Sequence, residues 1–291
     1  MIESLDYNGN RNQNRNDRTH SQTTIAIINQ KGGCAKTTTA VNLSAGLARE
    51  GEKVLLVDMD PQGHAGMGLG VEVYELEKTT YDLLLDEEVV IDEVAVETYV
   101  EGLRVVPANI KLAGGVVELS SKIGSEMTLR RKINEHLENS ASEFDIDICL
   151  IDCPPSLGSL TVTAINASDQ LIIPSQMSHY SLEGIVDLLD TVDMVRKNLD
   201  RDDLEILGVL PTRYDKRNKT VNSQVMGELK DYFEEKLFTT KISKNLDLDK
   251  AQAEGETIFD YNSNSAGAES YRQLTEEVLA RLESEGDEQY E

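Results

Sequence analysis

The fold is decided by the stretch Asn29-Gln30-Lys31-Gly32-Gly33-Cys34-Ala35-Lys36-Thr37-Thr38-Thr39. The apolar, β-branched run 24–28 precedes it and predicts a short buried strand. The run 38–50 follows it, with apolar side chains spaced as in a helix that packs on a sheet. A strand, a glycine-bearing loop and a Lys-Thr pair that opens a helix together indicate a phosphate-binding loop.

Each part of this loop suits a phosphate group. Glycines let backbone amides close around phosphate oxygens, and the helix N-terminus adds unpaired donors and a favourable dipole. Lys36 would reach the terminal phosphates, and the Thr37 hydroxyl would bind magnesium. The alternative is a glycine turn without a ligand, which the motifs described below disfavour. The nucleotide contacts predicted from the loop are Lys31, Gly32, Gly33, Cys34, Ala35, Lys36, Thr37 and Thr38.

Two further buried runs end in carboxylates. The run 53–57 leads into Asp58-Met59-Asp60-Pro61-Gln62-Gly63, and the run 146–151 ends at Asp152 before two prolines. Carboxylates at the C-terminal ends of parallel strands face the crevice where such sheets bind ligands. A single aspartate after an apolar strand is also the residue that holds magnesium beside the threonine of a phosphate loop. For the first run, a turn that uses aspartates for local hydrogen bonds is the alternative.

The remaining pattern alternates strands and helices. Strands are predicted at 103–107, 170–174 and 204–210, and helices at 79–85, 126–140, 182–198 and 220–235. This alternation predicts an α/β fold, a doubly wound and mostly parallel sheet with helices on both faces. We expect a disordered arm at 1–22, one ATPase domain at 23–283 and an acidic tail at 284–291. The basic triplet 130–132 is interpreted as a solvent-facing part of its helix.

The three motifs together resemble those of the ParA/MinD family of P-loop ATPases. Lys-Gly-Gly-x-x-Lys-Thr-Thr, with Lys31 at its start, is similar to the deviant Walker A motif of that family, although Ala35 stands where the family usually has glycine. The resemblance implies that Lys31 reaches the nucleotide of a second subunit, that Asp60 orients the attacking water, and that Asp58 lies nearer the phosphates and metal. It also implies the metal-side role of Asp152 and places adenine near Pro211, Thr212 and Arg213.

Cys149 and Cys153 raise the question of a metal site. They lie four residues apart, but Pro154 ends the strand, and relatives with an iron–sulfur cluster or a Cys-x-x-Cys pair use another spacing. We therefore favour buried thiols without a ligand. A metal-cluster reductase remains as a distant alternative function.

The composition is strongly acidic, with 53 Asp and Glu against 28 Lys and Arg and a net charge of −25. We interpret this excess as adaptation to a halophilic cytoplasm, and we expect a halophilic archaeal source. No apolar run is long enough to span a membrane, and no secretory signal is visible. Three cysteines give no disulfide framework, so a cytoplasmic location is expected.

The resemblance implies an ATP- and magnesium-dependent switch that dimerises with ATP and partitions plasmids or chromosomes. A centromere-binding partner protein would stimulate hydrolysis, and the ATP dimer would bind nonspecific DNA on the nucleoid. The acidic C-terminal residues argue against membrane binding. The alternative is a cargo-positioning or regulatory ATPase that acts through proteins without DNA, since Asp247 replaces an arginine expected for DNA contact. The candidate DNA contacts are Lys216, Arg217, Lys219, Lys244 and Lys250.

Overall fold

A computed structural model describes residues 22–178 and 181–288, so the arm expected at 1–22 lies almost wholly outside the described residues. Within these residues, seven strands form one sheet in the order β3-β4-β2-β5-β1-β6-β7. Of the strand pairs in this described part, only β3–β4 is antiparallel. The expected doubly wound, mostly parallel sheet is therefore confirmed. The strands are β1 (Thr23–Ile27), β2 (Val54–Asp58), β3 (Val96–Glu97), β4 (Leu103–Val106), β5 (Ile148–Asp152), β6 (Gln170–Gln176) and β7 (Glu205–Thr212).

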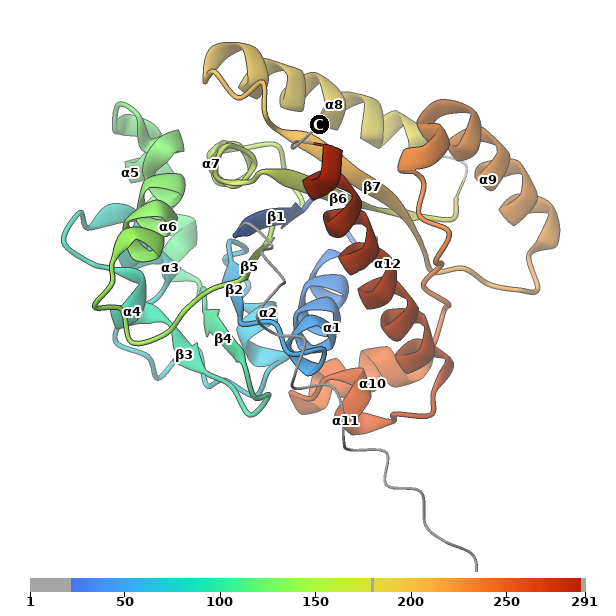
Figure 1. The fold of residues 1–291 in the computed structure, drawn as a ribbon, viewed down its shortest axis with the longest axis horizontal. Coiled ribbons are helices and arrows are strands. Elements are labelled where there is room, and N and C mark those ends of the chain that lie inside the picture. The colour runs from blue at the N-terminus through green and yellow to red at the C-terminus, as the bar shows by residue number, and fades with distance from the viewer. Residues whose placement is uncertain (1–21, 179–180, 289–291) are drawn as a thin grey trace, which may run out of the picture.

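Helices cover both faces of this sheet, as Figure 1 shows. One core lies between the sheet and α1, α2 and α10–α12, and the other lies beneath α3–α9. The helices are α1 (Lys36–Arg49), α2 (His64–Met67), α3 (Thr80–Leu85), α4 (Ile91–Val94), α5 (Lys111–Ser121), α6 (Thr128–Glu138), α7 (Ser159–Ala167), α8 (Ser181–Asn198), α9 (Lys219–Phe233), α10 (Leu246–Glu254), α11 (Ile258–Tyr261) and α12 (Ala266–Glu288), with 3₁₀ turns η1 (Ser125–Met127) and η2 (Glu234–Lys236).

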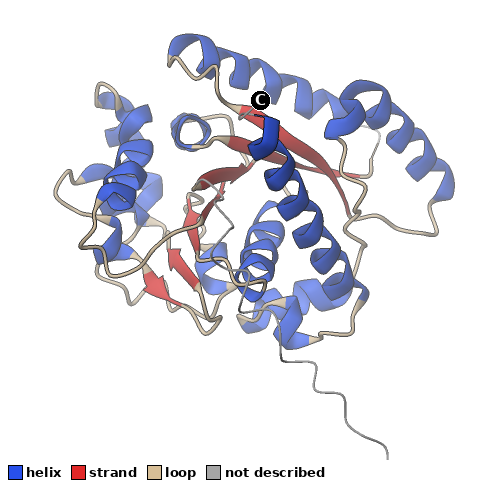
Figure 2. Ribbon diagram, in the orientation of Figure 1, coloured by secondary structure: helices blue, strands red, loops and turns tan. Residues whose placement is uncertain are grey.

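The predicted elements are all present, with shifted ends (Figure 2). Strand β7 continues through Thr212, so Pro211 and Thr212 belong to the sheet rather than to the loop after it. Helix α12 runs to Glu288 and so includes much of the stretch 284–291 that was expected as a separate tail. The sheet places the ends of β1, β2 and β5 side by side, because Ile27 and Asp58 both pair with Asp152.

The expectation for the basic triplet at 130–132 was wrong for Lys132. Its side chain is 1% exposed, and its ammonium donates to the backbone carbonyls of Glu87 and Val89 at 2.5 and 2.6 Å. Burial lowers the pKa of Lys132. A lysine on a polar-looking helix is buried here because the loop before α4 folds over α6 and offers carbonyl oxygens as acceptors.

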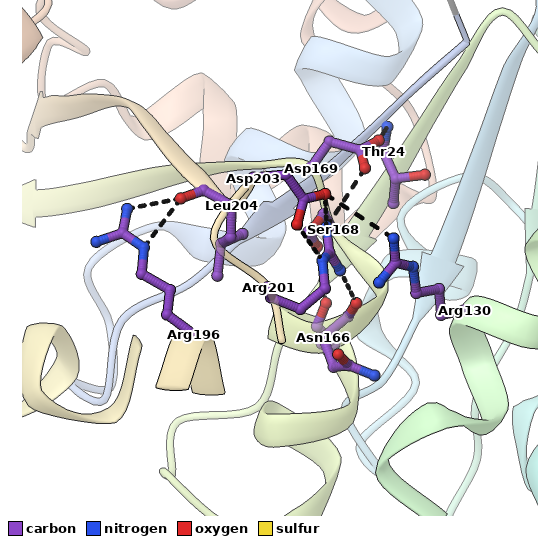
Figure 3. A network of polar contacts seen from close by, with 10 residues as sticks. Thr24, Arg130, Asn166, Ser168, Asp169, Arg196, Arg201, Asp203 and Leu204 are labelled. Carbon is purple, nitrogen blue, oxygen red and sulfur yellow. Dashed lines mark hydrogen bonds and ion pairs between the residues drawn. The ribbon is translucent and has the colours of Figure 1, made fainter. Parts of the chain in front are cut away.

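A buried arginine lies near the N-terminal ends of β1, β6 and β7 (Figure 3). Arg201 is fully buried, and its guanidinium donates to the carbonyls of Asn166 and Ser168. It also donates to Asp203 at 2.8 Å. Because Asn166 and Ser168 end α7 and Arg201 follows α8, this one side chain joins two crossovers on the same face of the sheet.

We predict that Arg201→Met lowers the free energy of unfolding by about 2–4 kcal/mol, because two buried carbonyls lose their donors and a methionine cannot replace them. Arg131→Gln is the matched control, because Arg131 is 46% exposed and its pair with Glu135 is long at 3.8 Å. Urea denaturation of both variants measures the difference. Equal stabilities for the two would contradict the role given to Arg201.

Candidate functional site

The loop between β1 and α1 turns through left-handed backbone at two positions. Gly33 has φ 72° and Ala35 has φ 73° and ψ 33°. Ala35 caps α1 without a side-chain hydrogen bond, so the first amides of the helix stay available. Left-handed backbone costs a non-glycine residue about 1–2 kcal/mol, which is the physical reason for glycine at this position in similar loops. Ala35 keeps the turn and carries its strain.

Lys36 lies beneath this turn. Its side chain is 6% exposed, and its ammonium donates to the carbonyl of Lys31 at 3.3 Å across the loop. From the sheet, the Thr212 hydroxyl donates to the carbonyl of Cys34 at 2.9 Å. Thr212, expected near adenine, therefore fixes the loop itself. Cys34 is buried, and burial raises the pKa of its thiol, so it contributes its backbone rather than a reactive sulfur.

Asp152 ends β5 as a buried carboxylate. Neither oxygen has a hydrogen-bond partner among the described residues. Burial raises the pKa of Asp152 well above its usual value, and Asp58 raises it further, whereas Thr37 and Lys36 favour the charged form. An unpaired carboxylate inside a protein is costly unless a cation or donor reaches it. Hard oxygen ligands suit Mg²⁺, so Asp152 and the Thr37 hydroxyl fit a magnesium site.

Asp58 lies opposite Asp152 on the neighbouring strand and is also fully buried. Its oxygens accept the amides of Asp60, Ala65 and Gly66 at 2.9, 3.0 and 3.4 Å. Burial raises the pKa of Asp58 to about 7, although these amides lower it. Asp58, expected near the metal, thus also holds the start of α2 in place.

Asp60 is partly exposed after β2. Its Oδ1 accepts the Gln62 amide at 3.0 Å, and its own amide donates to Asp58. Asp60 follows the end of β2, and the residue is partly exposed, as a residue that orients water requires.

Lys31 makes a contact that the sequence did not predict. Its ammonium donates to the Ser178 hydroxyl at 2.8 Å, and its amide donates to Asn29 Oδ1 at 2.8 Å. Ser178 follows β6, whose carboxyl end lies at the same edge as the phosphate loop. The position of Ser178 just after a predicted buried strand was the sequence signal that could have identified it as a site residue.

The C-terminal helices hold the other side of α1. Thr38 donates to Gln252 at 3.3 Å, and the Thr39 hydroxyl lies 3.2 Å from the Tyr271 hydroxyl. Asn42 accepts the amide of Ile258 at 2.7 Å. Because these partners lie more than two hundred positions away in the chain, no local pattern marked them as part of the site.

The predicted basic residues gather beyond β7. A bridge between Tyr214 and Ser243 places the loop at 216–219 beside Lys244, and all five predicted side chains are exposed. Arg217 is paired with Asp215 at 2.7 Å, and this partner lowers the pKa of Asp215 to about 2. Asp247 accepts from Asn262 at 2.9 Å and lies 3.9 Å from Lys250. Arg213, expected near adenine, is exposed with φ 53°.

Cys149 and Cys153 are buried in the same core, and burial raises the pKa of both thiols. Among the described residues, no group of three or more His, Cys, Asp or Glu side chains is arranged to hold a metal ion. In the same part of the chain, no helix has the length and apolar character needed to cross a membrane.

Comparisons with known proteins identify relatives of this chain. The profile of a family described as AAA domain matches residues 22–206. The chain is 47% identical over 256 residues to the sporulation initiation inhibitor protein Soj of Bacillus subtilis, covering 88% of this chain and 98% of that protein. It is 42% identical to the chromosome-partitioning ATPase Soj of Thermus thermophilus, covering 89% and 96%. Among solved structures, cobyrinic acid a,c-diamide synthase from Mycobacterium smegmatis with bound ATP analog and magnesium has a TM-score of 0.76 at 33% identity, covering 90% and 96%.

We predict that Ala35→Gly raises the free energy of unfolding by about 0.5–1 kcal/mol, because glycine adopts the left-handed turn without strain but loses more freedom on folding. Urea denaturation measures the change. Ala45→Gly, in the interior of α1, is the control and should destabilise, since it lowers helix propensity and opens space in the core. Loss of stability in both variants would contradict the strain at Ala35.

We also predict that the nucleotide- and metal-free protein loses stability as the pH rises from about 4 to about 7. Folded Asp58 and Asp152 keep their protons to higher pH than the unfolded chain does, so their contribution is present at low pH and disappears as they ionise. Denaturation at a series of pH values measures the slope. Asp152→Asn should flatten it, and an unchanged slope would contradict the burial of an unpaired charge.

Proposed function

Because the chain belongs to the ParA/Soj-type family of AAA-domain proteins and has the P-loop NTPase fold, we propose that it is a magnesium-dependent ATPase that acts as a switch in plasmid or chromosome partition. The observation that carries this proposal is the buried carboxylate of Asp152, unpartnered among the described residues and placed beside Thr37 under a phosphate loop. ATP and Mg²⁺ are the ligands that such a pair of oxygens and such a loop accept together.

The residues of the site divide the chemistry between them. The amides after Gly33 and the ammonium of Lys36 bind the phosphate oxygens, and Thr37 and Asp152 would hold Mg²⁺. When bound, Mg²⁺ neutralises charge that develops on the transferred phosphoryl group. Asp60 orients the water that attacks in line with the leaving group. Lys31 supplies a second ammonium in this deviant Walker A loop, and in the proposed switch it acts on the nucleotide of a second copy.

Dimerisation follows from this role of Lys31. Two lysine ammonium groups, one from each subunit, are attracted to the phosphates most strongly while the terminal phosphate adds its negative charge. ATP would therefore bring the copies together, and hydrolysis would release them. A protein partner that binds the dimer and stimulates hydrolysis would then set the lifetime of the switch. We place the protein in the cytoplasm, associated with the nucleoid.

Nonspecific DNA binding is supported by the exposed basic residues beyond β7, where Arg217 and Lys244 lie on neighbouring loops. Phosphate contacts weaken steeply with salt, and the net charge of −25 supports a protein adapted to concentrated salt. The second candidate, a positioning or regulatory ATPase without DNA, is favoured by two observations. Asp215 already pairs with Arg217, and Asp247 stands beside Lys250.

We predict that the protein hydrolyses ATP slowly and co-sediments with DNA only when ATP and Mg²⁺ are present, in buffers of high potassium concentration. Lys36→Ala should abolish both, because phosphate binding loses its buried ammonium. Arg217→Glu separates the two candidates, since it should reduce DNA co-sedimentation and leave the ATPase rate unchanged. Hydrolysis without any DNA binding, over a series of salt concentrations, would favour the second candidate, and no hydrolysis at all would contradict both.

A further inference from the structure

Three consecutive residues at the start of the phosphate loop contact β6 and α8. Each uses its side chain as a donor, and each partner lies on a different part of that segment, so the loop is joined to it at three points. The bonds run from Asn29 Nδ2 to the Pro174 carbonyl at 2.8 Å, from Gln30 Nε2 to Asp187 Oδ2 at 2.9 Å, and from Lys31 Nζ to Ser178 Oγ at 2.8 Å.

The bond from Asn29 to Pro174 is more deeply buried than the bond from Lys31 to Ser178. Asn29 is 3% exposed and also accepts the Lys31 amide, so it fixes the backbone of Lys31 against β6. The bond from Lys31 to Ser178 is only partly buried, and it joins two side chains. The Lys31 ammonium can therefore change partner by rotation of its own side chain, while its backbone stays in place.

Ser178 is presented by ordered backbone. The amide of Met177 donates to the Thr212 carbonyl at 3.1 Å, which extends the pairing of β6 with β7 beyond Gln176. The amide of Ser178 donates to the Gln176 carbonyl at 2.8 Å in a tight turn. The backbone of Ser178 is therefore fixed beside the phosphate loop, where its hydroxyl accepts from the Lys31 ammonium.

We propose that Ser178 is a positioning residue that holds the Lys31 ammonium when no nucleotide is in reach, and that this bond is given up when Lys31 moves to a phosphate oxygen across the dimer. The inference rests on the proposed function, because it assigns a regulatory contact to the same lysine. A hydrogen bond from an ammonium to a neutral hydroxyl is weaker than one to an anionic phosphate. The exchange is thus most favourable while the terminal phosphate is present and adds its negative charge.

This bond opposes dimerisation. Each copy must break its Lys31–Ser178 bond before its lysine reaches the partner's nucleotide, so the bond raises the concentration of protein at which the ATP dimer forms. After hydrolysis and phosphate loss, Ser178 again becomes the better acceptor within reach. The bond acts as a latch that favours separation of the copies.

The test is the protein concentration at half-maximal dimerisation with ATP and Mg²⁺, measured by sedimentation velocity in high potassium. Ser178→Ala should lower that concentration by about 25-fold, because two such bonds are removed per dimer and each partly exposed bond is expected to contribute about fivefold. Ser178→Thr keeps the hydroxyl and should behave as the parent protein does. A structural defect would weaken dimerisation, so a gain cannot arise from damage to the fold.

Ser175→Ala is the matched control on the same strand. The Ser175 hydroxyl is buried without a hydrogen-bond partner in the described part of the chain, and its loss should leave the dimerisation concentration unchanged. If Ser178→Ala dimerises at the parent concentration or at a higher one, the latch is contradicted while the proposed function stands. If the parent protein does not bind ATP, with or without Mg²⁺, the proposed function itself is contradicted.

Discussion

The structure of the site depends on the burial of two carboxylates at the ends of adjacent strands. Asp58 and Asp152 are paired in register and fully buried, and burial raises the pKa of both. The Asp58 carboxylate raises the pKa of Asp152 further. Asp58 accepts hydrogen bonds from backbone amides, whereas neither Asp152 oxygen has a hydrogen-bond partner among the described residues. Ionised Asp152 is therefore costly unless a cation reaches it, and burial raises its pKa so that it keeps its proton to higher pH when no cation is near.

The phosphate loop is held from both sides by distant parts of the chain. Thr212 and Ser178 contact it from β7 and the end of β6, and Gln252 contacts the start of α1 from α10. A change in the loop on nucleotide binding is therefore felt on both faces of the sheet at once. This arrangement suits a switch, because occupancy of one site alters contacts with several elements that a partner can recognise.

The sequence predicted the strands and the chemistry of the loop because both depend on local pattern. Apolar runs bounded by glycine and proline are strands in most contexts, and an aspartate after each run falls at the ligand-binding edge. The contacts of Lys132 and Ser178 could not be predicted, because their partners lie 43 and 147 residues away in the chain. The strain at Ala35 could not be predicted for another reason. It lies in a positive backbone φ, which only the structure gives.

The claim on which everything else rests is that Thr37 and Asp152 hold a magnesium ion beside a bound nucleotide. Calorimetric titration of ATP into the nucleotide-free protein, with and without Mg²⁺, tests it most directly when parent protein and Asp152→Asn are compared. We expect Mg²⁺ to tighten ATP binding to the parent by about tenfold or more, and we expect the variant to lose most of this gain. Equal affinities with and without Mg²⁺ in the parent protein would contradict it.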